Sequence, residues 1–169
     1  MDKREIRKEV RDAFSHFSDK KAEEERIISR IRALEAYNAA NTVLVYHALY
    51  DEADLSPLFS DGKTFLFPYI EGDSMFFSPP PLVKGAFGIM EPASRIETCY
   101  NHALLIAPAR ALSKKGERIG RGKGYYDRYI RENRNRIVTI GVCFSFQLYE
   151  TLPVGVMDER LEHIISGGL

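Results

Sequence analysis

Short runs of apolar and β-branched residues, each about the length of one strand, recur along the chain and constrain its fold more than any other feature. The four clearest runs are TVLVYHAL (42–49), TFLFPYI (64–70), HALLIAPA (102–109) and RIVTIGVCF (136–144). They are apolar nearly throughout, which is typical of strands buried on both faces in a parallel sheet. With helical stretches between them, they predict a single α/β domain over residues 1–169: three layers, with a largely parallel open sheet and helices on both faces.

The helices are predicted from periodicity and from capping residues. Residues 2 to about 36 are expected to be helical, with a break at Ser18-Asp19, where either residue can cap the second helix. Ser56-Pro57 suits the N-cap and the first position of a short helix. A further helix is predicted over GYYDRYIREN (124–133).

Two shorter strands and one irregular segment complete the predicted elements. SMFFS (74–78) and HIIS near the end of the chain are expected to be strands. PPPLVKGAFGIMEPA (79–93) contains too much Pro and Gly for regular structure, so we expect a loop there.

The charge balance limits the classes of partner. Lys+Arg and Asp+Glu both number 24, so the formal net charge is zero, whereas general nucleic-acid binders usually carry a basic excess. The two cysteines form no metal-binding pair or disulfide framework, and no segment resembles a signal peptide or a membrane span. We expect a cytoplasmic monomer that binds small molecules and neither nucleic acid nor membrane.

The segment RIGRGKGYYDRYI (118–130) carries the clearest functional signal. It fits neither the GxxxxGK[ST] nor the GxGxxG template, because Gly follows Lys123 and because Tyr125 stands where the second template needs Gly. Alternating glycines nevertheless let main-chain amides approach a ligand, and the predicted helix N-terminus behind them favours an anion. With three cations interspersed, the segment indicates a phosphate-binding loop. The alternative is a glycine-rich connector with solvated charges.

Asp127 and the tyrosines that follow the glycines could each have one of two roles. Asp127 could stabilise the helix dipole, or it could hold Mg²⁺ beside bound phosphates. Among the three tyrosines at 125, 126 and 129, one is expected in the core and another in a pocket wall or stacked on a flat ligand.

This segment resembles the signature of the 5-formyltetrahydrofolate cyclo-ligase (5,10-methenyltetrahydrofolate synthetase) family, an Arg-x-Gly-x-Gly-x-Gly-Tyr-Tyr-Asp run. KREIR near the start, YHALYDE after the first strand and FGIMEP resemble three further family segments in the same order. The resemblance implies an ATP- and Mg²⁺-dependent ring closure of 5-formyltetrahydrofolate, through a phosphorylated formyl (imidate phosphate) intermediate. It also implies the general fold shared by sugar-phosphate isomerases and coenzyme A transferases.

On the nucleotide side, the resemblance implies roles for matched residues at both ends of the chain. The residues that would contact ATP are Lys3, Arg7, Arg118, Gly120, Arg121, Gly122, Lys123, Gly124, Tyr125 and Tyr126. Arg121 and Lys123 would act catalytically on the transferring phosphate, and Asp127 and Asp158 would be the Mg²⁺ ligands. Taken without the resemblance, Lys3 and Arg7 fit a solvated helix face and Asp158 fits a surface loop.

On the substrate side, the resemblance implies that His47, Glu52, Phe87 and Tyr125 bind the folate. A carboxylate at position 52 can accept paired hydrogen bonds from the pterin, and it follows a strand end, where ligands of open α/β sheets bind. The alternative is that the acids at 51, 52 and 54 cap the next helix, which fits Asp54 best. The alternative for His47 is a core group, which is the more common role of a lone His on an apolar strand.

Two other function classes remain open at this stage. A phosphosugar isomerase or coenzyme A transferase-like enzyme would bind phosphates without hydrolysing ATP, but it would need a base or an acyl-accepting glutamate near the loop, and none is evident. A non-catalytic nucleotide- or folate-binding protein is the second alternative.

Overall fold

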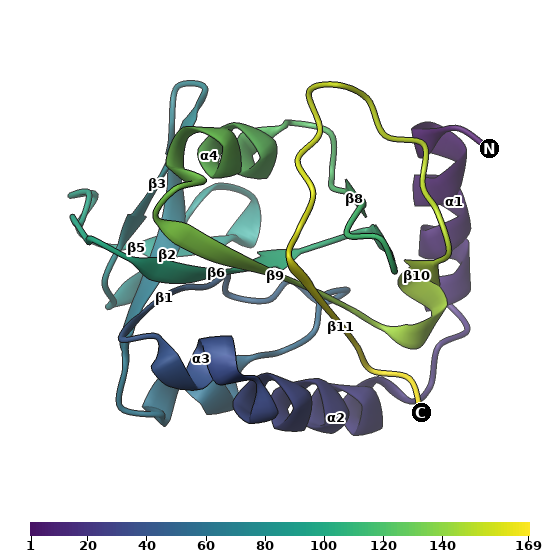
Figure 1. Ribbon diagram of the computed structural model, residues 1–169, viewed down its shortest axis with the longest axis horizontal. Helices are drawn as coiled ribbons and strands as arrows, with labels where there is room; N and C mark the ends of the chain where they lie inside the picture. The colour runs from purple at the N-terminus through teal and green to yellow at the C-terminus, as the bar shows by residue number, and fades with distance from the viewer.

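The computed structural model describes residues 1–169 and is built on a six-stranded sheet in the order β11-β9-β6-β1-β2-β3 (Figure 1). The strands are β1 (Thr42–Leu44), β2 (Thr64–Glu71), β3 (Ser74–Ser78), β6 (Ala103–Pro108), β9 (Ile137–Cys143) and β11 (His163–Ser166). All neighbouring pairs are parallel except β2 and β3. The prediction of a largely parallel sheet is confirmed.

Helices cover both faces of this sheet, as predicted. Figure 1 shows α2 (Lys20–Ala33) and α3 (Glu35–Ala39) on one face and α4 (Tyr125–Asn133) on the other. Successive residues of one strand serve opposite layers: Val43 belongs to the apolar cluster under α2, whereas Leu44 belongs to the cluster under α4. Alternating burial on two faces explains why the strands are apolar throughout.

The first helix, α1 (Lys3–Phe14), stands beside these layers on a small sheet of its own (Figure 1). Asp2 starts the helix with a capping box, accepting from the Glu5 N–H at 2.8 Å while the Glu5 carboxylate accepts from the Asp2 N–H at 2.7 Å. The small sheet consists of β10 (Leu148–Tyr149), β7 (Ala111–Ser113) and β8 (Arg118–Ile119), in that order. Ile6 and Val10 pack on it, which brings the helix against the glycine-rich loop that follows β8.

Several predicted boundaries were wrong. The strand predicted over 42–49 is regular only to Leu44, after which the chain leaves the sheet toward the site. Segment 79–93 is not a plain loop, because β4 (Leu82–Lys84) and β5 (Met90–Pro92) pair around a 3-10 turn, η2 (Ala86–Gly88).

The helix starts also differ in detail from the prediction. Asp19 is the N-cap residue of α2, yet its side chain makes no capping hydrogen bond. The short helix near Pro57 is a 3-10 helix, η1 (Ser56–Ser60), whose N-cap is Leu55 rather than Ser56. The Asp54 carboxylate accepts from the Ser56 N–H, at the first position of this turn, at 2.9 Å, although Asp54 is not its N-cap residue.

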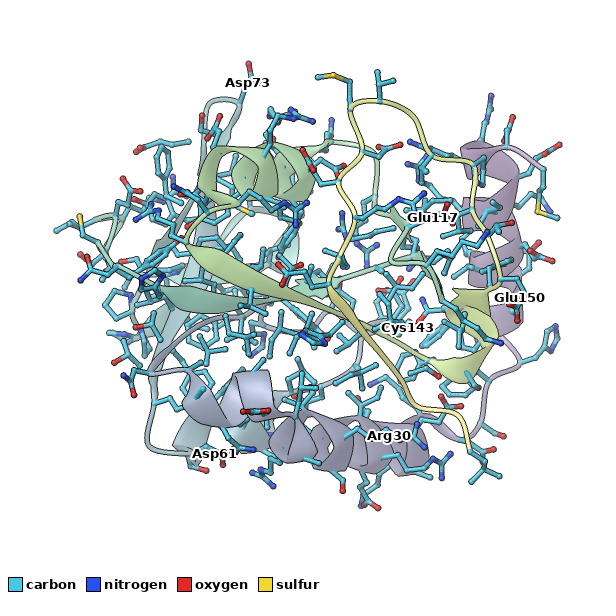
Figure 2. The ribbon with its side chains drawn as sticks, in the orientation of Figure 1. Arg30, Asp61, Asp73, Glu117, Cys143 and Glu150 are labelled. Carbon is cyan, nitrogen blue, oxygen red and sulfur yellow. The ribbon has the colours of Figure 1, made fainter.

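Side chains fill both layers of the core, with Cys143 among them (Figure 2). Burial raises the pKa of the Cys143 thiol to about 12, so it behaves as a small apolar group there. A further 3-10 turn, η3 (Ser145–Gln147), follows β9. None of the helices has both the length and the apolar character needed to cross a membrane.

Candidate functional site

A cavity of about 670 Å³ gathers all of the candidate residues named from the sequence. Its walls come from α1, the segment after β1, the β4–β5 hairpin, the loop between β8 and α4, and the segment before β11. The candidate residues that line it are Lys3, Arg7, His47, Glu52, Phe87, Arg118, Gly120, Arg121, Gly122, Lys123, Gly124, Tyr125, Tyr126, Asp127 and Asp158. Residues from both ends of the chain therefore share one site.

The glycine-rich loop joins β8 to α4 in a conformation that requires glycine. Gly122 has φ 111° and Gly124 has φ 73°, backbone angles that other residues rarely adopt. A Cβ on Gly120 would lie 2.9 Å from the Arg118 guanidinium. Gly124 is the N-cap of α4 and provides no side-chain cap, so the first N–H groups of the helix are left available to an anion.

Arg118 lies at the base of the loop as a buried cation without an acidic partner. Its side chain donates from Nε to the Pro108 carbonyl at 2.7 Å, and its guanidinium carbon lies 4.8 Å from the centre of the Tyr126 ring. It is 7% exposed and takes part in none of the ion pairs of the structure. Burial lowers the pKa of Arg118, although Asp127 favours its charged form. A buried unpaired charge is unfavourable unless a ligand compensates it, so this position suits an anion.

Arg121, at the tip of the loop, is paired with carboxylates. Its NH2 group donates to Asp51 Oδ1 at 2.7 Å and lies 3.5 Å from Glu52 Oε2. Asp51 is buried and also accepts from Arg110 NH1 at 2.5 Å. Burial alone would raise the pKa of Asp51, but the hydrogen bonds and charges of Arg121 and Arg110 outweigh it and lower that pKa. Asp51 is therefore ionised at neutral pH.

Asp51 and Arg110 were not predicted as site residues. The sequence alone indicates only that Asp51 could cap the next helix, and it is Asp54 that bonds the start of that turn. Its two arginine partners lie 59 and 70 positions away in the chain, and no local spacing pattern links residues so far apart.

The N-terminal helix contacts the loop and the C-terminal segment directly. Arg7 Nε donates to the Gly120 carbonyl at 2.8 Å, and the Lys3 ammonium group pairs with Asp158. Burial would raise the pKa of Asp158, but its bonds with Lys3 and with the Gly155 N–H outweigh it, and the pKa is lowered. These contacts exclude the alternative that Lys3, Arg7 and Asp158 are merely solvated surface residues.

The residues expected on the folate side differ in exposure. His47 is exposed and lines the cavity, so the core-group alternative is wrong for it. Glu52 Oε1 accepts from the Leu49 N–H at 2.9 Å, which leaves its second oxygen toward Arg121. Phe87, at the tip of the β4–β5 hairpin, is 99% exposed and has φ 58°. Tyr125 is partly buried beneath Arg128, whose guanidinium carbon lies 5.2 Å from the ring centre.

Tyr129 is the core tyrosine of α4. Its ring is buried against Phe77, with ring centres 4.9 Å apart, and its hydroxyl forms a hydrogen bond with the Tyr100 hydroxyl. Tyr125 and Tyr126 instead line the cavity. The expected division of the tyrosines between core and pocket wall is confirmed.

Asp127 and Asp158 are the candidate ligands for a metal ion that a bound substrate would also coordinate. Asp127 and Asp158 both line the cavity, and Asp127 Oδ1 accepts from the Glu159 N–H at 3.0 Å, so its other oxygen is not used there. No cluster of three or more His, Cys, Asp or Glu side chains forms a metal cage. Mg²⁺ commonly takes one or two carboxylates and completes its shell with phosphate oxygens and water. Both hydrogen bonds to Asp158, from Lys3 and from the Gly155 N–H, fall on its Oδ2, so each of the two carboxylates keeps one oxygen for a further partner.

Comparisons with solved structures agree with this architecture. The NMR structure of Aquifex aeolicus 5,10-methenyltetrahydrofolate synthetase superposes with a TM-score of 0.80 at 31% identity, covering 99% of this chain and 90% of that one. A 5,10-methenyltetrahydrofolate synthetase from Mycoplasma pneumoniae gives a TM-score of 0.72 at 22% identity, with 98% of both chains covered. At that identity, the second likeness supports the fold alone.

Sequence comparisons point to the same family. The chain is 29% identical to the 5-formyltetrahydrofolate cyclo-ligase of Escherichia coli K12 in an alignment of length 142 that covers 75% of this chain and 78% of that protein. The matches with the Haemophilus influenzae and Schizosaccharomyces pombe relatives, at 32% and 26% identity, span only 49% and 63% of the relatives' length and 52% and 64% of this chain. The sequence model of the 5-formyltetrahydrofolate cyclo-ligase family matches residues 1–167. The chain belongs to the 5-formyltetrahydrofolate cyclo-ligase family.

Proposed function

We propose that this chain catalyses the ATP- and Mg²⁺-dependent cyclisation of 5-formyltetrahydrofolate to 5,10-methenyltetrahydrofolate, with release of ADP and phosphate. Membership of the family supports this proposal, as does the likeness to the solved 5,10-methenyltetrahydrofolate synthetase of Aquifex aeolicus. The single observation that carries it is Arg118, a buried cation without a carboxylate partner, set beside the uncapped N-terminus of α4 in the cavity. That combination favours a polyphosphate.

The reaction would proceed in two displacements. The formyl oxygen attacks the γ-phosphorus as the bond to ADP breaks, and N10 then attacks the formyl carbon as phosphate leaves with the former formyl oxygen. The N10 proton passes to solvent. Such chemistry needs positioning and charge stabilisation more than acid–base side chains.

The residues around the cavity suit these needs. Arg118 and the α4 N-terminus would hold the polyphosphate, with Lys3 and Arg7 as further nucleotide contacts. Arg121 and Lys123 would stabilise the negative charge on the transferring phosphoryl group. Asp127 and Asp158 would hold Mg²⁺, which when bound neutralises charge on the phosphate oxygens.

The folate would lie on the other side of Arg121. Glu52 would accept the paired N–H groups of the pterin, and its side chain is only 11% exposed, which strengthens such a bond. His47, Phe87 and Tyr125 line the same cavity and would contact the rest of the substrate.

We also infer that the layered fold is of the general class found in sugar-phosphate isomerases and coenzyme A transferases. Those activities require a free base or an acyl-accepting carboxylate near the phosphates. The buried carboxylate nearest the loop tip, Asp51, is paired with two arginines, so it does not suit that task. We further propose that the protein acts as a monomer on small molecules, for which the cavity of about 670 Å³ offers room.

The direct test is to incubate the protein with 5-formyltetrahydrofolate and Mg·ATP and to follow the absorbance of the methenyl product. We expect product only when both substrates are present, with one ADP formed per methenyl group. Absence of product would reject the cyclo-ligase proposal. ATP binding without product would favour the non-catalytic alternative.

The proposed metal role is tested by Asp127→Ala and Asp127→Asn. The Asn variant keeps an acceptor for the Glu159 N–H but loses the charge, so it separates the metal role from the structural one. We expect both variants to remain folded, to lose most turnover and to require more Mg²⁺. Unchanged turnover in the Asn variant at low Mg²⁺ would show that Asp127 is not a ligand.

A further inference from the structure

The buried carboxylate of Asp51 connects the rigid part of the molecule to the tip of the glycine-rich loop. It is 6% exposed, and each of its oxygens accepts from a different arginine: Oδ2 from Arg110 and Oδ1 from Arg121. The two arginines differ in exposure and in how their backbones are held, so only the Arg110 end of this link is fixed.

The Arg110 end of this link is fixed. The Arg110 N–H donates to the Ile119 carbonyl at 2.8 Å, and its own carbonyl accepts from the Gln147 side chain at 3.2 Å. Its side chain is only 10% exposed. A residue held through both its backbone and its side chain provides a stable anchor for Asp51.

The Arg121 end has no comparable support from its own backbone. Arg121 stands between Gly120 and Gly122 in the loop tip, and its side chain is 45% exposed. Apart from its contacts with Asp51 and Glu52, its guanidinium makes no hydrogen bond or ion pair with the protein. A guanidinium carries five N–H donors, so donors remain for a ligand in the cavity while the carboxylates set its orientation.

We propose that Asp51 is a positioning residue that aligns Arg121 with the phosphoryl group that is transferred. This inference rests on the proposed function, in which Arg121 stabilises that group. Arg7 holds the neighbouring Gly120 carbonyl but not the side chain of Arg121, and an exposed arginine has many rotamers. The anchored carboxylate removes this freedom before substrates bind, which is the preorganisation that charge stabilisation requires.

Steady-state kinetics of Asp51→Asn test the proposal. Asn has nearly the same shape but no charge, and it can accept well from only one of the two arginines. We expect kcat to fall roughly 10–100-fold, the scale of a small misplacement of a reacting group, with smaller changes in both KM values. Asp54→Asn is the matched control: an exposed carboxylate three positions along that bonds the start of a turn, for which wild-type kcat is expected. Wild-type kcat in Asp51→Asn would overturn the proposal.

A double-mutant cycle separates positioning from general stability. In an Arg121→Ala background, Asp51→Asn should cause no further loss of kcat, because the group that it orients is gone. An equal loss in both backgrounds would show that Asp51 acts through the fold and would overturn the proposal. If Asp51→Asn does not fold, Asp51→Glu takes its place, because it keeps the charge and displaces the carboxylate by one methylene.

A measurement without substrates keeps this inference separate from the proposed function. The NMR order parameter of the Arg121 Nε–H group should fall in Asp51→Asn protein. That of Arg128, which is held by the Lys123 and Asp73 carbonyls, should not change. If wild-type protein forms no methenyl product, the proposed function fails while this result still tests Asp51. An unchanged Arg121 order parameter, or an equal fall for Arg128, would overturn the positioning role.

Discussion

The base and the tip of the glycine-rich loop hold their arginines in opposite ways. At the base, Arg118 is buried in β8, held by a carbonyl and an aromatic ring, with no carboxylate near enough to pair. At the tip, Arg121 is half exposed and paired with Asp51, with Glu52 close by. Only two residues, Ile119 and Gly120, separate these two cations, whose charges are balanced quite differently.

We infer from this difference that Arg118 mainly binds the ligand, whereas Arg121 is held in a fixed orientation. An unpaired buried cation gains the most when an anion arrives, because no internal partner competes with the ligand. A cation that is already paired gains less from binding but keeps a defined direction. In the proposed reaction, the base of the loop would supply affinity for ATP and the tip would act on the transferring phosphoryl group.

The largest effect is expected from Arg121→Ala. Removing a group that stabilises charge mainly in the transition state should reduce kcat about 10²–10³-fold, with a much smaller change in the KM for ATP. Steady-state kinetics with each substrate varied in turn would measure both. A large rise in the KM for ATP with normal kcat would mean that Arg121 also binds ATP. That result would contradict the division of roles between the base and the tip of the loop.

Arg118→Met should instead weaken ATP binding, by roughly 10–100-fold on the scale of charge-assisted hydrogen bonds. The unfolding temperature without ligand should stay near the wild-type value, because the variant also removes an unpaired buried charge. Calorimetric titration with a non-hydrolysable ATP analogue and a thermal melt would test both parts. Unchanged affinity would show that the base of the loop does not bind the polyphosphate.

Glu52→Gln should raise the KM for 5-formyltetrahydrofolate about 10-fold, because the amide cannot accept both pterin N–H groups. The KM for ATP should change little. This variant sharpens the comparison, since Glu52 lies on the Arg121 side of the cavity. An effect confined to ATP would contradict the folate role.

The smallest effect concerns stability in acid. The pKa of Asp51 in the folded protein is lowered from its ordinary value of 3.8, so its ion pairs stabilise the fold above about pH 4 and this contribution is lost as pH falls through the lowered pKa. The difference in unfolding free energy between wild type and Asp51→Asn should therefore be present at neutral pH and vanish in strong acid. Denaturant unfolding across pH would measure it. Asp54→Asn should show a smaller pH dependence, because Asp54 is exposed and forms no ion pair with an arginine.

Much of the fold follows from local sequence pattern, and the exceptions have physical causes. The central strands were predicted because fully apolar runs are distinctive. β8 and β10 have only two residues each, too few to show any periodicity. The first strand was predicted too long because Val45 and Tyr46 are still buried in the core, and the Val45 N–H still bonds the Leu66 carbonyl, although the regular strand ends at Leu44. The β4–β5 hairpin was missed because its glycines and prolines resemble those of a loop.

Some features of the candidate site could also be predicted from the sequence, whereas others could not. The glycine spacing and the interspersed cations predicted an anion-binding loop, and the structure places that loop at a helix N-terminus in a cavity. The balance of charge could not be predicted, since a sequence does not tell which arginine meets a carboxylate. Arg118 and Arg121 look equivalent in the sequence, and only the fold distinguishes them.

The pair between Lys3 and Asp158 has a consequence for the synthesis of the protein. These residues are 155 positions apart, so one wall of the cavity comes from α1 and the facing wall from a segment that is made much later. Contacts between such distant residues cannot form until the intervening chain has closed. A nascent chain that stops short of residue 158 would lack one side of the nucleotide pocket. We therefore expect ligand binding to begin only when the fold is complete, so that partly made chains do not sequester either substrate.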